Sequence, residues 1–177
     1  ERVHLTREPT TGPIGVQIRH ILSGRIVSRP GGKAPAPVDP STIALLFAAD
    51  RLDHIQNEIR PFLEDGHHVI CDRYVLSSMA YQGVEVDQKF LRAINAKAMA
   101  PDITFFLNVS PEVAMQRIQG SRTERDLFET LPFQRKVAQR YADVVNEYRD
   151  GPVETIDGEA AMEKVTSVVI KALEPLL

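Results

Sequence analysis

The sequence is poor in cysteine and has no long apolar run. Its 177 residues include a single cysteine, Cys71, so a disulfide framework is excluded and a reducing compartment, the cytoplasm, is expected. No apolar segment approaches the roughly 20 residues of a membrane span, and no signal peptide is visible. We therefore expect a cytoplasmic protein that does not bind a membrane.

The sequence also lacks a strong charge of either sign. Its net charge is −3, so no global field favours binding to nucleic acid, and we expect no nucleic-acid partner. Hydrophobic residues make up 43% and charged residues 25%, which is ordinary for a globular protein. The length predicts one domain spanning residues 1–177.

Short apolar segments alternate with helical patterns along the chain. Strands are expected at residues 3–5, 69–71, 103–109 and 153–156. Helices are expected at residues 14–22, 41–64 with a kink at Pro61, 86–98, from 110 onward, 131–149 and 162–176. This alternation predicts an α/β fold with a parallel sheet flanked by helices on both faces. The apolar continuity of 103–109 favours a strand buried on both faces, as is typical of a parallel sheet.

The most informative feature is Asp72-Arg73-Tyr74, which follows the apolar run 69–71, expected to be a buried strand. In open α/β sheets, ligands bind outside the carboxyl ends of the strands. A carboxylate and a guanidinium placed there can hold a metal ion and a phosphate. The segment Thr6-Arg7-Glu8-Pro9 follows the first strand and has the same kind of position. The alternative for this second segment is an Arg–Glu pair on a turn.

Two pairs of residues share a helix face at a spacing of four. Phe47 and Arg51 could hold a planar heterocycle by stacking and hydrogen bonding; alternatively, Phe47 is core and Arg51 reaches to water. Ser78 and Gln82 could read the polar edge of a base, because a hydroxyl and an amide can each donate and accept. The alternative for the second pair is an ordinary surface helix.

Arginines surround a polar interruption after residue 117. Arg117, Arg122 and Arg125 could form a loop that closes over phosphates, or a solvated loop. By contrast, the segment Gly31-Gly32-Lys33 is not a phosphate loop, since the earlier glycine is missing and Ala34 replaces the required Ser or Thr. We also reject metal binding by His67-His68, which has no matching cluster of ligands.

Taken in order, these motifs resemble those of thymidylate kinases, which use ATP to phosphorylate dTMP to dTDP. The matching stretches are Thr6-Arg7-Glu8-Pro9, residues 46–51, residues 72–83 and residues 101–112. The resemblance implies a P-loop NTPase-like three-layer sandwich, dTMP and ATP as ligands, Mg²⁺ as the metal, and a homodimer.

The resemblance also implies roles for individual residues. Phe47 would stack on thymine, Arg51 would bind its carbonyl edge, Ser78 and Gln82 would contact its other polar edge, and Tyr81 would pack under the deoxyribose. The remaining substrate contacts would come from Glu8 and from the phosphate-binding Arg7, Arg19 and Arg73. The catalytic residues would be Asp72, which would lie near magnesium, together with Arg73, Arg122 and Arg125. Arg122 and Arg125 would belong to a lid at about residues 120–128. These two arginines and Asp157 would border ATP.

The sequence departs from the family pattern in places. No motif of the form G-x-x-x-x-G-K-[ST] occurs in it, so we expect that the first strand and the P-loop of the fold are absent from the printed chain, which would be inactive without them. Thr10-Thr11 stand where the family has glycines, and residues 84–87 replace a Gly- and Arg-rich segment. Two other functions stay open: a kinase of another nucleoside monophosphate, and a nucleotide-binding module without activity.

Overall fold

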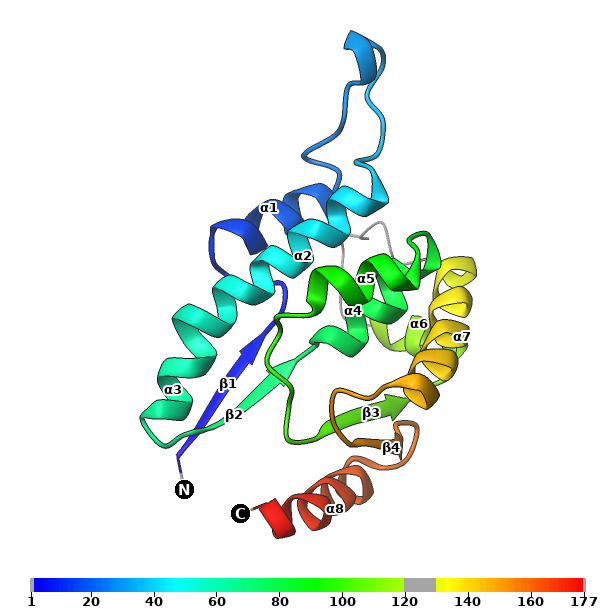
Figure 1. Cartoon of the computed structure of the whole chain (residues 1–177). Helices are drawn as coiled ribbons and strands as arrows, with labels where there is room; N and C mark the ends of the chain where they lie inside the picture. Colours follow the sequence, from blue (N-terminus) through cyan, green and yellow to red (C-terminus); the bar gives the residue numbers. More distant parts are fainter. Residues whose placement is uncertain (1, 120–129, 177) are drawn as a thin grey trace.

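The computed structural model describes residues 2–119 and 130–176, so the lid expected at 120–128, with Arg122 and Arg125, lies outside the described residues. Helices and strands alternate along the chain (Figure 1). Their bounds are β1 Val3–Arg7, α1 Pro13–Leu22, η1 Pro30–Gly32, α2 Pro40–His54, η2 Ile55–Ile59, α3 Arg60–Glu64, β2 His68–Asp72, α4 Val75–Tyr81, η3 Gln82–Val84, α5 Gln88–Asn95, β3 Thr104–Asn108, α6 Pro111–Gln119, α7 Leu131–Glu147, β4 Val153–Asp157, α8 Met162–Leu173 and η4 Glu174–Leu176.

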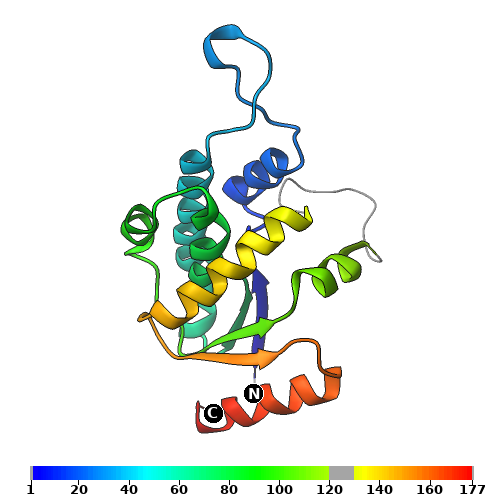
Figure 2. The ribbon, with the colours of Figure 1, turned by 90° about the vertical axis from the view of Figure 1, so that its right-hand side faces the viewer.

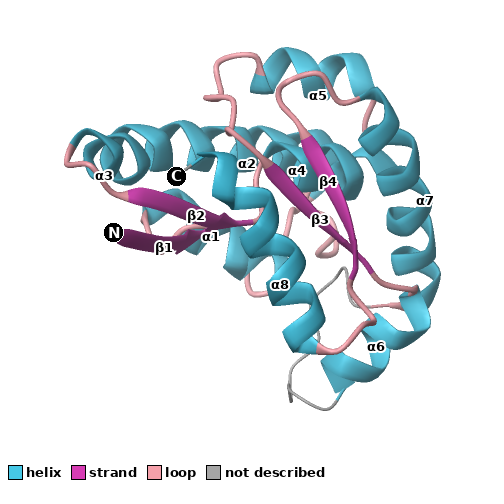
Figure 3. Ribbon diagram, turned by 90° about the horizontal axis from the view of Figure 1, so that it is seen from below, coloured by secondary structure: helices cyan, strands magenta, loops and turns pink. Residues whose placement is uncertain are grey.

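The strands pair in parallel, which confirms the predicted α/β class. β1 pairs with β2 in a register that ends at Arg7↔Asp72, and β3 pairs with β4 in a register that ends at Asn108↔Asp157. Each connection between paired strands runs through helices, as a parallel pair requires. Within the described residues the two pairs form separate two-stranded sheets, and Figure 3 shows them apart from each other. The sequence predicts a parallel sheet from which the first strand of the fold is missing, and the described strands form two short parallel pairs.

Among the described residues, helices cover one face of the β1–β2 pair. Thr6 and His4 point to the covered side, where they meet side chains from the α2–η2 helix. On the opposite side Leu5 is 71% exposed and Ile70 is 52% exposed. The expectation that residues 69–71 form a buried strand is thus wrong for Ile70, because alternate side chains point to opposite faces and the helices cover one of them.

The pair β3–β4 lies between α7 on one side and α8 on the other (Figure 2). Phe106 of β3 stacks on Tyr141 of α7 with the ring centroids 4.8 Å apart. Leu107, which points the other way, is 50% exposed. The expectation that residues 103–109 are buried on both faces is therefore wrong on the side toward α8, where the cover is incomplete.

The long helix predicted at 41–64 begins as its sequence indicates and contains a π-helical turn just before Pro61, where a kink was expected. Asp39 caps α2 by accepting hydrogen bonds from the backbone N–H groups of Ser41 and Thr42 at 2.9 and 3.1 Å. A π-helical turn, η2, separates α2 from α3 and ends just before Pro61. Proline lacks an N–H and its ring crowds the carbonyl four residues earlier, so a wider turn at this point relieves the clash.

The chain between α1 and α2 forms an arm that projects away from the body of the molecule (Figures 1 and 2). Two backbone hydrogen bonds between Ser28 and Ala36, of 2.8 and 2.9 Å, hold its two sides together. Gly31 and Gly32 turn the tip with φ angles of 57° and 74°, which glycine adopts without strain. The Pro- and Gly-rich segment between residues 24 and 40 is therefore a hairpin-like arm.

The main apolar core lies where α2, α4, α5 and α7 meet. Its most buried members are Ala44, Met79 and Leu91, from three of these helices, with Val144 from α7. This core fixes α2, α4 and α5 relative to one another. Those three helices carry the polar side chains described below.

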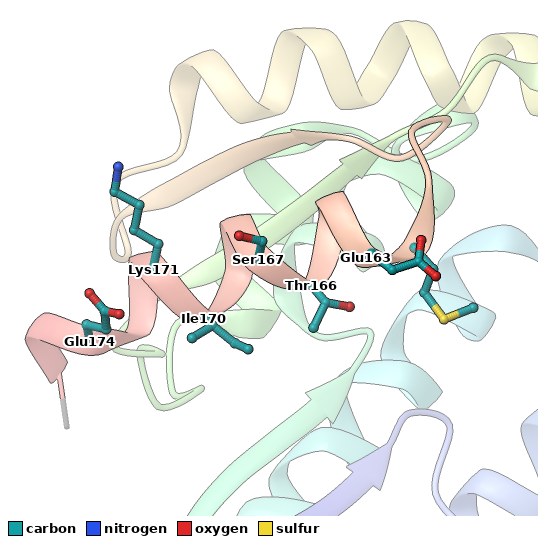
Figure 4. A pocket seen from close by; sticks show the side chains of 7 residues that line it. Glu163, Thr166, Ser167, Ile170, Lys171 and Glu174 are labelled. Carbon is teal, nitrogen blue, oxygen red and sulfur yellow. The ribbon is translucent and has the colours of Figure 1, made fainter.

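A hollow of about 760 Å³ lies along α8 (Figure 4). It is lined by Met162, Glu163, Thr166, Ser167, Ile170, Lys171 and Glu174. The helix expected at 162–176 is confirmed, yet its apolar positions are poorly covered, with Met162 and Ile170 both exposed. No helix in the described parts of the chain has the length and apolarity needed to cross a membrane.

Candidate active site

Three charged residues come together at the carboxyl ends of β1 and β2. Arg7 and Asp72 are register partners on the two strands, and Arg73 follows directly. All three are exposed. Arg73 has a φ of 68°, a left-handed conformation that costs a non-glycine residue roughly 1–2 kcal/mol. Such strain is concentrated at functional sites, where the surrounding structure maintains it.

The side chain of Arg73 is directed by α4. Its guanidinium carbon lies 4.9 Å from the centre of the Tyr81 ring, a cation–π distance, and its Nη1 donates to Ser77 Oγ at 3.3 Å. Tyr141 of α7 packs edge-on against Tyr81 with centroids 6.2 Å apart. Burial raises the pKa of Tyr141 to about 12, so this ring is neutral and its hydroxyl is available to hydrogen-bond Ser77. The expected phosphate-binding arginine and the expected sugar-packing tyrosine are therefore adjacent.

Arg51 is the centre of a buried polar network. It is 1% exposed, and its Nη2 donates to Glu8 Oε2 at 2.6 Å and to Ser78 Oγ at 2.9 Å. Its Nη1 donates to the side-chain oxygen of Asn95. The ring of Tyr74 lies under the guanidinium, 5.1 Å from its carbon. The alternative that Arg51 reaches to water is wrong, because partners from the loop after β1, from α4 and from α5 hold it in the interior.

The second oxygen of Glu8 continues this network to the surface. His54 Nδ1 lies 3.2 Å from Glu8 Oε1, and His54 Nε2 lies 2.8 Å from Thr6 Oγ1 and 3.5 Å from Glu58 Oε2. His4 Nε2 lies 2.8 Å from the other Glu58 oxygen. Glu8 and Arg51 are a buried ion pair, and a buried pair of this kind is strongly disrupted when one partner is removed.

The loop after β1 is held by two charged side chains. Asp50 Oδ2 accepts from the backbone N–H of Thr10 at 2.8 Å and its Oδ1 accepts from the Thr10 hydroxyl at 2.7 Å. Arg19 donates through Nη1 to the carbonyl oxygens of Pro9 and Thr10. A Cβ on Gly15 would lie 2.1 Å from the Thr10 carbonyl oxygen, so only glycine lets α1 approach this loop. Arg19 thus shapes the loop that carries Arg7 and Glu8.

Four buried side-chain atoms of the described residues have no hydrogen-bond partner, and two of them belong to residues that the sequence predicts to contact the base. These two are Arg51 Nε, a donor, and Gln82 Oε1, an acceptor. Gln82 lies four residues after Ser78, which itself contacts Arg51, so Gln82 continues the same face of the α4–η3 helix. A buried donor and a buried acceptor without partners can both be satisfied by a ligand whose edge carries one acceptor and one donor.

Two groups of side chains could be considered as metal ligands. Asp72 is an exposed carboxylate at a strand end, and Mg²⁺ is bound by one or two carboxylates together with phosphates and water, so Asp72 fits Mg²⁺. Glu8, His54 and Cys71 have potential ligand atoms within 4.8 Å of one another. Burial raises the pKa of the Cys71 thiol, which keeps it protonated, and Glu8 is already paired with Arg51, so this group is a poor metal site.

The other predicted residues lie outside this cluster. Phe47 is half-buried on α2, one turn before Arg51. Asp157 ends β4, where its Oδ1 accepts from the backbone N–H of Glu159 at 3.0 Å. Arg117 donates to the Gly158 carbonyl at 2.9 Å, which places it beside the end of β4. Asp157 and Arg117 mark a second strand end, apart from the Arg7–Asp72–Arg73 group.

Comparison with known proteins adds independent information about this chain. Residues 1–169 match the model of a family described as thymidylate kinase. The chain belongs to the thymidylate kinase family. This confirms the family predicted from the sequence, together with its enzyme class, a phosphotransferase of nucleotide biosynthesis that makes dTDP from dTMP with ATP.

Several curated relatives agree with this assignment to the thymidylate kinase family. A probable thymidylate kinase of Pyrobaculum aerophilum is 43% identical over 142 residues, which cover 79% of this chain and 68% of the relative. A probable thymidylate kinase of Methanocaldococcus jannaschii is 37% identical over 173 residues, 96% of this chain and 81% of the relative. A thymidylate kinase of Trichormus variabilis is 34% identical over 182 residues, which cover 99% of this chain and 82% of the relative.

Sequence reasoning missed some residues of this thymidylate kinase site. Asp50, His54 and Asn95 are all at least nine-tenths buried, yet none was singled out. A signal was present for Asp50, because it follows the apolar run 43–49 of the same helix, where a charge is expensive unless it is paired. His54 had none, since its partner Glu8 is 46 residues away. Asn95 had no signal, since its partner Arg51 is 44 residues away.

The dependence of the free energy of unfolding on pH in the acid range should reveal the contribution of Glu58. Burial alone would raise its pKa, but hydrogen bonds from His4 and Thr6 outweigh this and lower the pKa below the ordinary 4.5. A carboxyl group with a lowered folded-state pKa adds stability above its unfolded pKa, and this stability is lost as the pH falls through the folded value. We expect the difference in free energy of unfolding between the wild type and Glu58→Gln to shrink as the pH falls from neutrality to about 3. Urea titrations across this range measure it, and a constant difference would contradict the argument.

Proposed function

We propose that the protein binds dTMP with its base beside Arg51 and its 5′-phosphate at the carboxyl ends of β1 and β2, and transfers the γ-phosphoryl group of ATP to that phosphate. The observation that carries the proposal is the pair of unpartnered buried atoms, Arg51 Nε and Gln82 Oε1. They offer one donor and one acceptor. A thymine edge offers the complement, the acceptor O4 and the donor N3–H.

This pair of atoms also argues against one competing class of substrate. Cytosine presents an amino group at position 4 and an acceptor at N3, which is the reverse order. Arginine can only donate, so Arg51 would meet the cytosine amino group with a second donor. A buried donor left unpaired costs about 1–3 kcal/mol, which is enough to disfavour dCMP. Uracil has the same edge as thymine, so other contacts must separate dTMP from UMP.

Tyr81 and Phe47 supply these further contacts in our proposal. Tyr81 packs under the deoxyribose, where its ring, held by Arg73 and Tyr141, would crowd a 2′-hydroxyl group. Phe47 stacks on the face of the base from the turn of α2 before Arg51. Ser78 completes the base site through its hydrogen bond to Arg51, and the hydrogen bond to Glu8 orients Arg51.

The phosphate end of the site works by positioning and charge in this proposal. Arg7 and Arg73 bind the 5′-phosphate of dTMP, and Arg19, whose Nη1 holds the loop carbonyls, adds its remaining N–H groups. Asp72 holds Mg²⁺, which neutralises charge on the phosphates when bound. We assign Arg122 and Arg125 to the lid over ATP and Asp157 to the border of the adenine. No covalent enzyme intermediate is needed, because an oxygen of the dTMP phosphate attacks the γ-phosphorus of ATP in line while the bond to the bridging oxygen breaks and ADP leaves.

The test is turnover of dTMP by the full-length protein. With ATP and Mg²⁺ we expect dTDP to form, and Asp72→Asn to lower kcat about 10²-fold or more, since it removes a charge that holds the metal. Gln139→Ala on the exposed side of α7 is a matched control. Preferential phosphorylation of UMP or dCMP, or no turnover, would overturn the proposal.

We further propose that the protein is a cytoplasmic homodimer. The support is an exposed apolar stripe on α2, in which Leu45 and Leu52 are seven residues apart and Ala49 lies between them. Residues at this spacing share a helix face. Light scattering on the wild type and on Leu45→Glu distinguishes a dimer that depends on this stripe from a monomer.

A further inference from the structure

Asn95, at the last turn of α5, contacts Arg51 from outside every motif that the sequence resemblance covers. Its side-chain oxygen accepts from Arg51 Nη1, and its side-chain nitrogen donates to the Leu91 carbonyl at 2.9 Å. It is 9% exposed. Both ends of the amide are therefore committed in the interior of the protein.

We propose that Asn95 is a positioning residue that sets the preference for a pyrimidine with a carbonyl group at position 4. This inference rests on the proposed function, in which Arg51 reads the base. Arg51 has five N–H donors. Glu8, Ser78 and Asn95 occupy three of them, which leaves the one on Nε and the second one on Nη1.

The orientation of the Asn95 amide is fixed by its own helix. Because its nitrogen is held by Leu91, the oxygen is the end that faces the guanidinium. If the Asn95 amide were flipped, its own N–H groups would face the N–H groups of the Arg51 guanidinium, and both are donors. Arg51 is thus tied at Nη1 by α5 and at Nη2 by Glu8 and Ser78, and a planar group fixed at two corners cannot turn in its plane.

Fixing the guanidinium decides what the free donors can recognise. Without Asn95, Arg51 would be held only at Nη2 and could pivot about that corner. The direction of the Arg51 Nε–H bond would then no longer be fixed. The free-energy cost of placing the 4-amino group of cytosine beside it would therefore fall. The hydrogen bond between Arg51 and Asn95 therefore favours nucleotides with an acceptor at position 4 of the base. It disfavours 4-amino pyrimidine nucleotides.

Asn95→Ala tests the inference, with Asn146→Ala as the matched control. Asn146 Nδ2 donates to the carbonyl of Ala142 at 2.8 Å, four residues earlier, as Asn95 does to Leu91, but Asn146 is exposed on α7 and far in sequence from the Arg51 partners. We expect Asn95→Ala to weaken dTMP binding in calorimetry by about tenfold, the effect of one hydrogen bond to a charged group. The binding ratio of dTMP to dCMP should fall, while the KM for ATP stays unchanged. Asn146→Ala should leave all three quantities at the wild-type value.

Asn95→Asp separates a positioning role from a structural one. Aspartate keeps an acceptor oxygen for Arg51 but cannot donate to Leu91, so we expect the dTMP to dCMP ratio to be largely restored although the protein unfolds at a lower temperature. An unchanged ratio in folded Asn95→Ala, or losses for dTMP, dCMP and ATP in equal proportion, would overturn the inference. A wild type that prefers dCMP would instead overturn the proposed function, so the two failures are distinguishable.

Discussion

Replacing Arg51 with alanine is expected to lower the free energy of unfolding by about 3–5 kcal/mol, the usual cost of removing one partner of a buried ion pair. The reason is that Glu8 would keep its charge in the interior with Arg51 no longer opposite it. Urea denaturation measures the effect. Arg92→Ala is the control, since Arg92 makes an exposed salt bridge to Glu147 at 3.1 Å, and it should cost less than about 1 kcal/mol.

A second variant keeps this prediction testable if Arg51→Ala does not fold. Adding Glu8→Gln removes the stranded charge, so the double variant should recover part of the lost stability. In any folded variant without Arg51, dTMP affinity should fall by about 2–5 kcal/mol. A stability loss no larger than that of Arg92→Ala, or unchanged dTMP affinity, would remove Arg51 from the proposed site.

Arg73→Ala is expected to lower kcat/KM for dTMP about 10²–10³-fold, the range seen when one preorganised donor to a developing charge is lost. The expectation follows from its position between Asp72 and the Tyr81 ring at the end of β2. Binding of dTMP should weaken far more than binding of thymidine, because the lost contact is to the phosphate. Equal losses for the two ligands would contradict a phosphate role. Arg135→Ala, which removes an exposed arginine bound to Glu112, is the control.

The backbone of Arg73 allows a finer comparison. Glycine adopts a φ near 68° without penalty, whereas alanine carries the same strain as arginine. Arg73→Gly should therefore lose as much activity as Arg73→Ala but be more stable than it by about 1 kcal/mol. Equal stability of the two variants would show that the left-handed conformation is not a source of strain.

Local patterns in the sequence predicted the helices and strands well. Asp39-Pro40 predicted the start of α2, because caps act on their immediate neighbours, and a π-helical turn, η2, stands just before Pro61, where a kink was expected. Burial was predicted less well. The apolar run around Ile70 suggested a buried strand and the run around Leu107 suggested a strand buried on both faces, but burial depends on which helices cover each face, and that is set by distant parts of the chain.

The same distinction holds for the site. The resemblance predicted the site residues Arg7, Glu8, Arg51, Asp72, Arg73, Ser78, Tyr81 and Gln82. The structure joins Glu8, Arg51 and Ser78 in one network and Asp72, Arg73 and Tyr81 in a second group. It also adds His54 and Asn95. These last two could not be predicted, because a buried hydrogen bond between residues more than 40 positions apart leaves no local pattern.

The arm between α1 and α2 has a practical consequence. Its tip at Gly31-Gly32 is exposed and is turned by two glycines, which is where chains tolerate insertion and are cut by proteases most readily. The base of the arm joins α1 to α2, the helix that carries Phe47 and Arg51. A fluorophore attached at the tip would leave the core undisturbed, and a protease cut there would split the chain into two pieces that the packing of α1 against α2 still holds together.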